Sequence, residues 1–322
     1  MSVTVRTDPV QTLEKFLLAK ADEFGRAIPR QLARSLTPDR MIRLALTACR
    51  KNPQLADCTQ VSLIACLMQA CQLGLELDDV LGHAYLVPYR NGKTRRLEAQ
   101  LIIGYKGFRS LAFRSGQVKA FPAHCVHAGD HFKFCHGSKP YLDFAPALKG
   151  RGEPIAVYAS VSLANGGFDF EVLGWEEVLA CQARYGTLPD GRKKNSPWWT
   201  HVEAMGCKTA VRRLAKRVPL TADLGRAANL DELAEEGLPQ GLPFDPKWLG
   251  QDAVNAEGRV TQQQLQELQL LSQILQPDEF QALVEQYGAE RPEELMAERA
   301  EELISHLEDL GGKSETMEEP QS

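Results

Sequence analysis

The spacing of apolar residues changes twice along this 322-residue chain, and that change constrains the fold class most. Residues 38–51 and 61–73 carry helical apolar runs with start and stop signals. Between residues 83 and 174, short apolar runs of strand length alternate with turns rich in Gly and Asn. Helical spacing returns from about residue 175. This order predicts an α+β fold in which an antiparallel β meander of hairpins is packed with helices.

The N-terminal third is predicted to be helical. Helical spacing over residues 10–36 indicates a helix that ends near Ile28-Pro29. Thr37-Pro38-Asp39 supplies a cap, a first-turn proline and a first-turn acid for the next helix, which should stop before Pro53. The run at 61–73 is apolar on nearly every side, so we expect this third helix to be buried.

The middle of the chain predicts three hairpins and further helices. The first hairpin leads into a helix at 104–116, and helices are also expected at about 175–185 and 198–218. The hairpins are 83–89 with 97–103 around a basic loop, 118–137 about Gly129-Asp130, and 155–163 with 168–174 around Asn165-Gly166-Gly167.

Charge divides the chain into two regions. Residues 1–220 hold 31 Lys and Arg against 19 Asp and Glu, whereas residues 221–322 hold 6 against 23. This division indicates a polyanion-binding part joined to a part with another role. We expect a basic core at 1–220, a flexible acidic linker at 221–259, a small three-helix interaction domain at 260–311 and a disordered tail at 312–322.

Targeting and redox signals favour a cytoplasmic protein. The first residues lack the apolar segment of an export signal, and no run of 18 apolar residues predicts a membrane span. The eight cysteines form no C-x-x-C pair, which indicates reduced thiols.

The basic helix near residue 210 is the main functional signal. At 100° per residue its cations fall on one half of the helix and its apolar residues on the other. No acid lies between Glu203 and Asp223, and like charges at i,i+4 repel. We therefore expect an external anion to neutralise this face, a solvated charged surface being the alternative. The cations are Lys208, Arg212, Arg213, Lys216 and Arg217.

Further cations occur in three other segments, with aromatic residues beside them. Basic residues that follow a backbone, with rings on which bases stack, suit single-stranded nucleic acid. The alternative is that the rings belong to the core, and for one of Trp198 and Trp199 that alternative is favoured. The candidate contacts are Arg90, Lys93, Arg95 and Arg96 at a hairpin tip, Tyr105, Lys106, Arg109 and Arg114 after the first hairpin, and Lys193, Lys194 and Trp198 in and after a polar loop.

Three segments carry a resemblance to a known family. HAYLVPYR (83–90), LIIGYKGFRSLAFRSGQV (101–118) and PWWTHVEAMGCKTAVRRLAKRVPL (197–220) resemble, in order and spacing, the RecT/Redβ family of phage and prophage single-strand annealing proteins. The resemblance covers about residues 30–220. Gly206-Cys207 departs from the Ala-Lys typical of the family and removes a cation next to Lys208.

The resemblance implies a recombinase without covalent catalysis that uses no ATP and pairs complementary strands. It implies a homo-oligomer, either a ring or a helical filament, and an architecture similar to the Rad52 annealing fold. Its implied partners are single-stranded DNA and annealed duplex DNA, with a partner exonuclease or a host single-strand-binding protein at the C-terminal domain. We expect one strand to lie in a basic groove with its bases exposed, and Gly104 and Gly107 to let backbone amides approach phosphates.

The sequence itself agrees with action without ATP. Gly92-Lys93-Thr94 resembles the end of a phosphate-binding loop, but that motif needs a glycine five residues earlier, where Val87 stands. No cofactor is therefore expected, and a divalent metal is expected only as a counterion of DNA.

Three alternatives stay open. A passive single-strand-coating protein would bind DNA without speeding its pairing. A metal-dependent nuclease would need clustered carboxylates, which Glu76, Asp78 and Asp79, or Asp169 and Glu171, supply only in part. A zinc protein would use the His- and Cys-rich segment, although the predicted hairpin divides its side chains between two faces. That segment contains His124, Cys125, His127, His131, Cys135 and His136.

Overall fold

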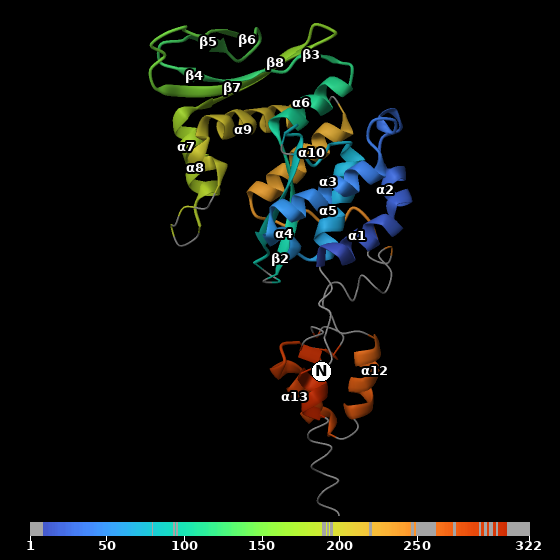
Figure 1. Ribbon diagram of the computed structural model, residues 1–322. Helices are drawn as coiled ribbons and strands as arrows, with labels where there is room; N and C mark the ends of the chain where they lie inside the picture. The colour runs from blue at the N-terminus through green and yellow to red at the C-terminus, as the bar shows by residue number, and fades with distance from the viewer. Residues whose placement is uncertain are drawn as a thin grey trace, which may run out of the picture. The chain divides into compact units, whose positions relative to one another are not determined.

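The computed structural model contains two compact units, which are described separately. The first comprises residues 1–58 and 62–241, and the second comprises residues 59–61 and 242–322. The first unit is a mixed α+β fold with antiparallel sheets packed against helices, which confirms the predicted class (Figure 1). The structure describes residues 9–78, 80–92, 94, 96–188, 191, 193, 196–218, 221–245, 248, 262–272, 275–289, 291–292, 295, 299–300 and 302–307.

The first unit begins with a layer of helices. The side chain of Thr37 caps α3 by accepting a hydrogen bond from the Arg40 amide at 3.3 Å. The predicted buried helix α5 ends at Gly74, whose φ of 61° permits the left-handed turn. The predicted single helix at 10–36 is instead divided among α1, α2 and η1. The elements are α1 (Pro9–Ala19), α2 (Ala21–Ala27), η1 (Arg30–Leu32), α3 (Pro38–Lys51), α4 (Pro53–Ala56) and α5 (Gln60–Leu73).

A hairpin and a helix follow this layer as predicted. Strands β1 (Ala84–Arg90) and β2 (Leu97–Ile103) pair antiparallel, with Ala84 opposite Ile103 and Arg90 opposite Leu97. Helix α6 (Tyr105–Arg114) starts directly after Gly104.

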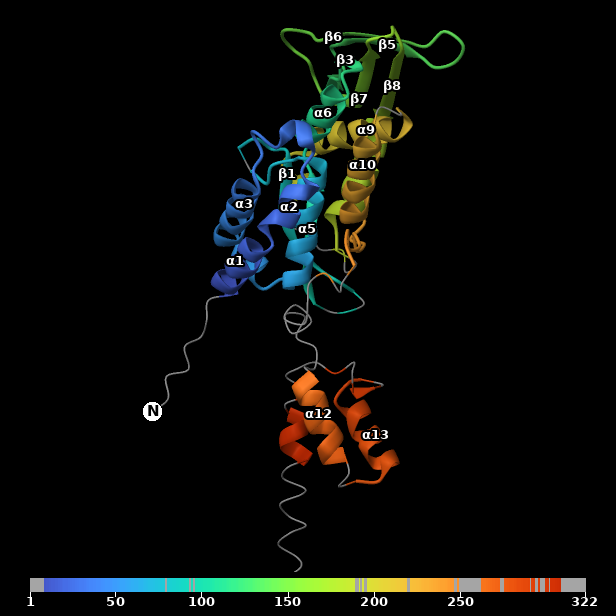
Figure 2. The ribbon, with the colours of Figure 1, turned by 90° about the vertical axis from the view of Figure 1, so that its right-hand side faces the viewer.

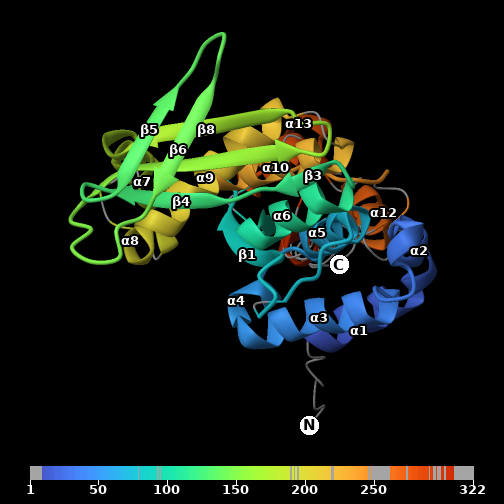
Figure 3. The same cartoon turned by 90° about the horizontal axis from the view of Figure 1, so that it is seen from above.

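A second sheet is built around the long strand β7 (Pro154–Leu163). It pairs with β8 (Phe168–Gly174) through the predicted turn, and with β3 (Val118–Ala120) and β4 (Ala123–His127). Strands β5 (His131–Cys135) and β6 (Tyr141–Ala145) form a separate hairpin that projects beyond the other strands (Figure 3).

The predicted hairpin at 118–137 is therefore wrong, because β4 and β5 do not pair with each other. The buried Asp130 carboxylate instead bonds the turn between them to residues 147 and 151. It accepts hydrogen bonds from the His127 and Ala147 amides and from the Arg151 guanidinium, all within 2.9 Å. These contacts direct β4 toward β7 and leave β5 free to pair with β6.

The helices α7 (Trp175–Gly186), α8 (Pro197–Thr200) and α9 (Val202–Arg217) complete the part that was predicted to be the core. The predicted continuous helix at 198–218 is interrupted at His201, whose φ of −143° and ψ of 52° are not helical. Helix α9 packs against β4, β7 and β8.

Residues 221–241 are structured, so the predicted linker is corrected in this stretch. Helix α10 (Ala222–Glu235) is capped by Thr221 and packs against β2, α6 and α9 (Figure 2). Its apolar face, which includes Leu224 and Ala228, is buried. Beyond it, the Gln240 side chain bonds both the amide and the carbonyl of Leu101. The remaining linker prediction at 249–259 lies outside the described residues.

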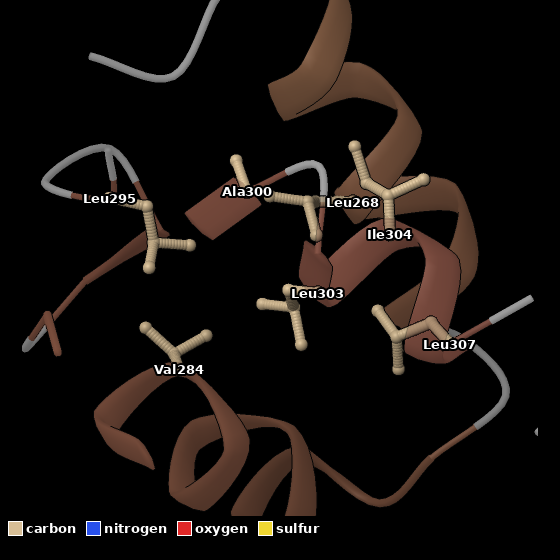
Figure 4. Packing of buried hydrophobic residues seen from close by; sticks show 7 residues of the cluster. All are labelled: Leu268, Val284, Leu295, Ala300, Leu303, Ile304 and Leu307. Atoms are coloured by element: carbon tan, nitrogen blue, oxygen red, sulfur yellow. The ribbon is translucent and has the colours of Figure 1, made fainter. Parts of the chain in front are cut away.

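The second unit contains α12 (Gln262–Leu271), α13 (Pro277–Gln286) and helical turns at 299–300 and 302–307. Gln276 and Glu279 form a capping box at α13. The tail predicted at 312–322 lies outside the described residues. The unit has its own apolar core (Figure 4), formed by Leu268, Val284, Leu295, Ala300, Leu303, Ile304 and Leu307.

None of the described helices is long and apolar enough to cross a membrane.

Candidate functional site

The five cations of α9 are ion-paired, so the prediction that they lack internal partners is wrong. Their carboxylate partners come from β8, α7 and α10. The pairs are Lys208 with Asp231 (2.7 Å), Arg212 with Asp231 (3.3 Å) and Glu235, Arg213 with Glu177 (2.5 Å), Lys216 with Glu232, and Arg217 with Asp169 (3.2 Å) and Glu171.

Two of these cations belong to a buried network centred on Asp231. The Asp231 side chain is 1% exposed, and it accepts hydrogen bonds from the Ile103 amide, Lys208 Nζ and the Arg212 guanidinium. Burial disfavours the charge of Arg212, but the Glu235 and Asp231 carboxylates outweigh this and raise its pKa. At 6% exposure the Arg212 side chain faces the protein rather than an external ligand. This network joins β2, α9 and α10, so Lys208 and Arg212 stabilise the fold.

The other three cations of α9 keep access to solvent. The side chains of Arg213, Lys216 and Arg217 are 37–45% exposed in their ion pairs. Exposed ion pairs contribute only ~0–1 kcal/mol. A phosphate group can therefore replace Glu177 or Glu232 at little cost, whereas Arg217 is held more firmly, because it bonds Asp169, the half-buried Glu171 and the Phe170 carbonyl.

Helix α6 presents exposed cations that have no carboxylate partner among the described residues. These are Lys106 and Arg109. The Arg109 guanidinium lies over the rings of Tyr105, at 5.7 Å, and Phe113, at 5.6 Å. The three side chains recur at every fourth residue and so form one stripe along the helix. Phe113, which is 39% exposed, was not predicted, although its spacing from Arg109 could have revealed it.

Arg114, at the end of the same helix, has a structural role. Its guanidinium donates hydrogen bonds to the Leu73 carbonyl at 2.7 Å and the Gly74 carbonyl at 3.0 Å. These carbonyl groups at the end of α5 have no partner within the helix, so Arg114 caps them. Burial lowers the pKa of Arg114. The prediction that Arg114 contacts DNA is therefore not supported by its position.

The two glycines at the start of α6, Gly104 before its first residue and Gly107 in its first turn, serve close packing of the backbone. A Cβ atom on Gly104 would lie 2.1 Å from the Gly82 carbonyl oxygen, and one on Gly107 would lie 2.2 Å from that of His83. This contact within the protein accounts for both glycines. The interpretation that they admit phosphates is corrected accordingly.

Replacing Gly107 by alanine is expected to lower the free energy of unfolding by about 1–3 kcal/mol, because the new methyl group forces the backbone apart. Gly225→Ala is a matched control in α10, because a Cβ at residue 225 meets nothing within 4 Å. The higher helix propensity of alanine should raise the free energy of unfolding of this control by up to about 1 kcal/mol. Urea denaturation followed by circular dichroism measures both. A Gly107→Ala protein as stable as wild type would contradict the packing role.

The remaining predicted contacts lie on other elements. Arg90 ends β1 and is exposed, and Arg96 is half-buried just before β2. Lys93, Arg95 and Lys194 lie outside the described residues. The structure therefore brings α6 and α9 into contact, while the hairpin tip and the residue 193 loop belong to separate elements.

Of the two adjacent tryptophans, the one chosen for base stacking is in the core. Trp198 is 2% exposed, and its Nε1 donates a hydrogen bond to Glu235 at 3.0 Å, so this prediction is wrong. Trp199 is half-buried, and the exposed Lys193 lies over its ring with Nζ 4.2 Å from the ring centroid. Lys193 and Trp199 thus repeat the pairing of a cation with a ring found on α6.

The carboxylates considered for a nuclease are held in ion pairs. Glu76 binds Arg40 at 2.6 Å, and Asp169 and Glu171 bind Arg217. Asp79 lies outside the described residues. In the part of the chain that is described, the one group of three potential metal ligands within 4.8 Å of one another is Cys125, His127 and Glu203.

Comparison with known proteins places this arrangement in context. A model of the RecT family matches residues 39–240. Protein RecT of Escherichia coli (strain K12) is 40% identical over 205 residues, which are 62% of this chain and 74% of that protein. The uncharacterized protein YqaK of Bacillus subtilis (strain 168) is 41% identical over 70 residues, 22% of each chain. The family match includes α10 and ends one residue before the end of the first unit.

Proposed function

Because this chain belongs to the RecT family of recombination and annealing proteins, we propose that it binds single-stranded DNA and pairs complementary strands without ATP. The observation that carries the proposal is the family match over residues 39–240. Proteins of this family are in general not enzymes, and the proposed reaction makes and breaks no covalent bond.

The strand is held first by the exposed face of α6. Lys106 and Arg109 supply charge for phosphates, and Tyr105 and Phe113 supply rings beside them. Stacking on such rings is worth ~1–3 kcal/mol per base and tolerates any sequence. The absence of a competing carboxylate among the described residues distinguishes these two cations from those of α9.

The exposed pairs of α9 extend this surface. α6 and α9 contact each other, so a strand that leaves α6 can reach Arg213, Lys216 or Arg217. Phosphates would then replace Glu177, Glu232 or the β8 acids as partners. Lys193 with Trp199 and the basic hairpin tip provide further contacts, which attract the second strand.

This arrangement explains annealing by positioning alone. Phosphates that face the protein leave the base edges turned outward, where they test an incoming strand. The duplex is held more tightly than either strand, which drives pairing forward. Neighbouring copies in a ring or filament continue the groove from one subunit to the next.

We also propose a role for the second unit. This acidic unit recruits a partner exonuclease or a host single-strand-binding protein. The alternative is that it inhibits the protein by competing with DNA for the basic surface. The protein acts in the cytoplasm, as its cysteine usage indicates.

The test is pairing of fluorescent complementary oligonucleotides without nucleotide. The wild-type protein is expected to speed pairing in EDTA and leave the strands intact. Binding without faster pairing would indicate a passive coating protein. Cleavage that needs a divalent metal would indicate a nuclease, and either result would reject the proposed function.

A further inference from the structure

A group of side chains that can ligate a metal lies between β4 and the start of α9. Cys125 Sγ, a ring nitrogen of His127 and a carboxylate oxygen of Glu203 lie within 4.8 Å of one another. Cys125 and His127 stand two residues apart on a strand that packs against α9, and Glu203 is in the first turn of that helix.

A fourth candidate ligand stands on the next turn of α9. Cys207 follows Glu203 by four residues, so the two side chains share one face of the helix. The Cys207 thiol is not among the ligand atoms that lie within 4.8 Å of one another, so it has to approach the other three to complete the site. Burial and the neighbouring Glu203 and Cys207 raise the pKa of the Cys125 thiol to about 12. Cys207 is half-buried and forms no disulfide.

The surroundings of His127 suit a metal ligand. Its Nε2 faces Glu203 Oε1 at 3.7 Å, and its Nδ1 is buried without a hydrogen-bond partner, 3.8 Å from Asp130 Oδ2. Metal-bound histidines commonly present their second nitrogen to a carboxylate. Arg151 and two backbone amides hold the Asp130 carboxylate beside His127.

We propose that Cys125, His127, Glu203 and Cys207 form a structural Zn²⁺ site that fastens the start of α9 to β4. Two thiolates, one imidazole and one carboxylate make a ligand set typical of tetrahedral zinc. Zinc bonds of ~2.0–2.2 Å place a tetrahedral nitrogen and oxygen ligand roughly 3.3–3.5 Å apart, so His127 and Glu203, now 3.7 Å apart, need to approach each other only slightly. Binding releases the two thiol protons to solvent and involves no redox change.

The proposed site also explains why Gly206-Cys207 stands where the family typically has Ala-Lys. A Cβ on Gly206 would lie 2.9 Å from Val178 Cγ1 in α7 and 3.2 Å from Val157 Cγ1 in β7, so this turn of α9 packs closely against both elements. A lysine at residue 207 would be directed toward the same half-buried region, where a cysteine can serve as a ligand.

The experiment measures metal binding by the full-length protein under reducing conditions. The protein is stripped with a chelator, dialysed against Zn²⁺ alone or Co²⁺ alone, and assayed for bound metal and for thiolate-to-cobalt charge-transfer absorption. Cys125→Ser and Cys207→Ser remove ligands. Cys135→Ser, on the exposed face of β5, and Cys181→Ser, on α7, are matched controls.

Wild type and both controls are expected to bind one metal per chain with a charge-transfer band. Removal of either cysteine ligand should weaken metal binding by more than ~10–100-fold, the loss that is typical when a residue hydrogen-bonded to a ligand is removed. Zn²⁺ should also raise the melting temperature of the stripped wild-type protein, a measurement that needs no variant. Equal metal content in all five proteins, no binding by wild type, or a Cys125–Cys207 disulfide in the protein isolated with reductant would overturn the proposal.

Discussion

Replacing Arg212 by alanine is expected to lower the free energy of unfolding by about 3–5 kcal/mol, because it leaves buried carboxylates without their partner. Arg212 binds Asp231 and Glu235, whose side chains are 1% and 9% exposed. Since Asp231 also holds Lys208 and the Ile103 amide, the loss extends to the contact of β2 with α10.

The neighbouring Arg213→Ala protein is the matched control. Arg213 is 40% exposed in its pair with Glu177, so its loss should change stability by at most about 1 kcal/mol. Chemical denaturation of both variants gives the comparison. If Arg212→Ala unfolds at the same denaturant concentration as Arg213→Ala, the buried network does not hold α9 to α10.

Reversing the charges of Lys106 and Arg109 on α6, which have no carboxylate partner in the described part of the chain, is expected to weaken binding of single-stranded DNA by ~100-fold or more. Charge-assisted contacts are worth ~1.5–3 kcal/mol each, and ~1.4 kcal/mol corresponds to a factor of ten. The change is Lys106→Glu with Arg109→Glu. Both side chains are exposed, so circular dichroism and melting temperature should stay as in wild type.

A charge-matched control separates this site from general electrostatics. Lys139→Glu with Lys149→Glu changes the net charge by the same amount at exposed positions outside the proposed surface. Fluorescence anisotropy with a labelled oligonucleotide measures affinity. Equal losses in the two double variants would show that net charge, and not the face of α6, determines binding.

The elements that the sequence predicted well are those set by local signals. The turns at Gly92 and at Asn165–Gly167 join strands that are neighbours in the chain, and both hairpins are confirmed. The prediction of a hairpin at Gly129-Asp130 was wrong although its turn signal was similar. The Asp130 side chain bonds Arg151, which is 21 residues away, and no local pattern reveals this contact.

The charge of α9 was misjudged for the same reason. Asp231 lies 19 residues from Arg212 and Asp169 lies 48 residues from Arg217, so no pattern within the helix reveals these pairs. The acids of α10 were also assigned to a linker that starts at residue 221. That boundary separated the cations from the carboxylates that neutralise them.

Part of the candidate site could nevertheless be predicted. Two of the three α6 cations proposed as DNA contacts, Lys106 and Arg109, are exposed as that role requires, and the four-residue spacing of Tyr105, Arg109 and Phe113 is visible in the sequence. The capping role of Arg114 could not be predicted, since it depends on the end of α5 lying beside α6.

The most direct test of the central claim, that exposed cations led by those of α6 hold the DNA backbone, is the salt dependence of affinity for a single strand. Wild-type affinity should fall roughly 300- to 16,000-fold between about 50 and 200 mM salt if ~6–10 phosphates of the single strand are neutralised, at a slope of about −0.7 per phosphate. The plot of log affinity against log salt should be shallower by ~1.4 for the Lys106→Glu, Arg109→Glu protein, because two contacts are lost. A flat response in wild type, or the same slope in both proteins, would contradict the account.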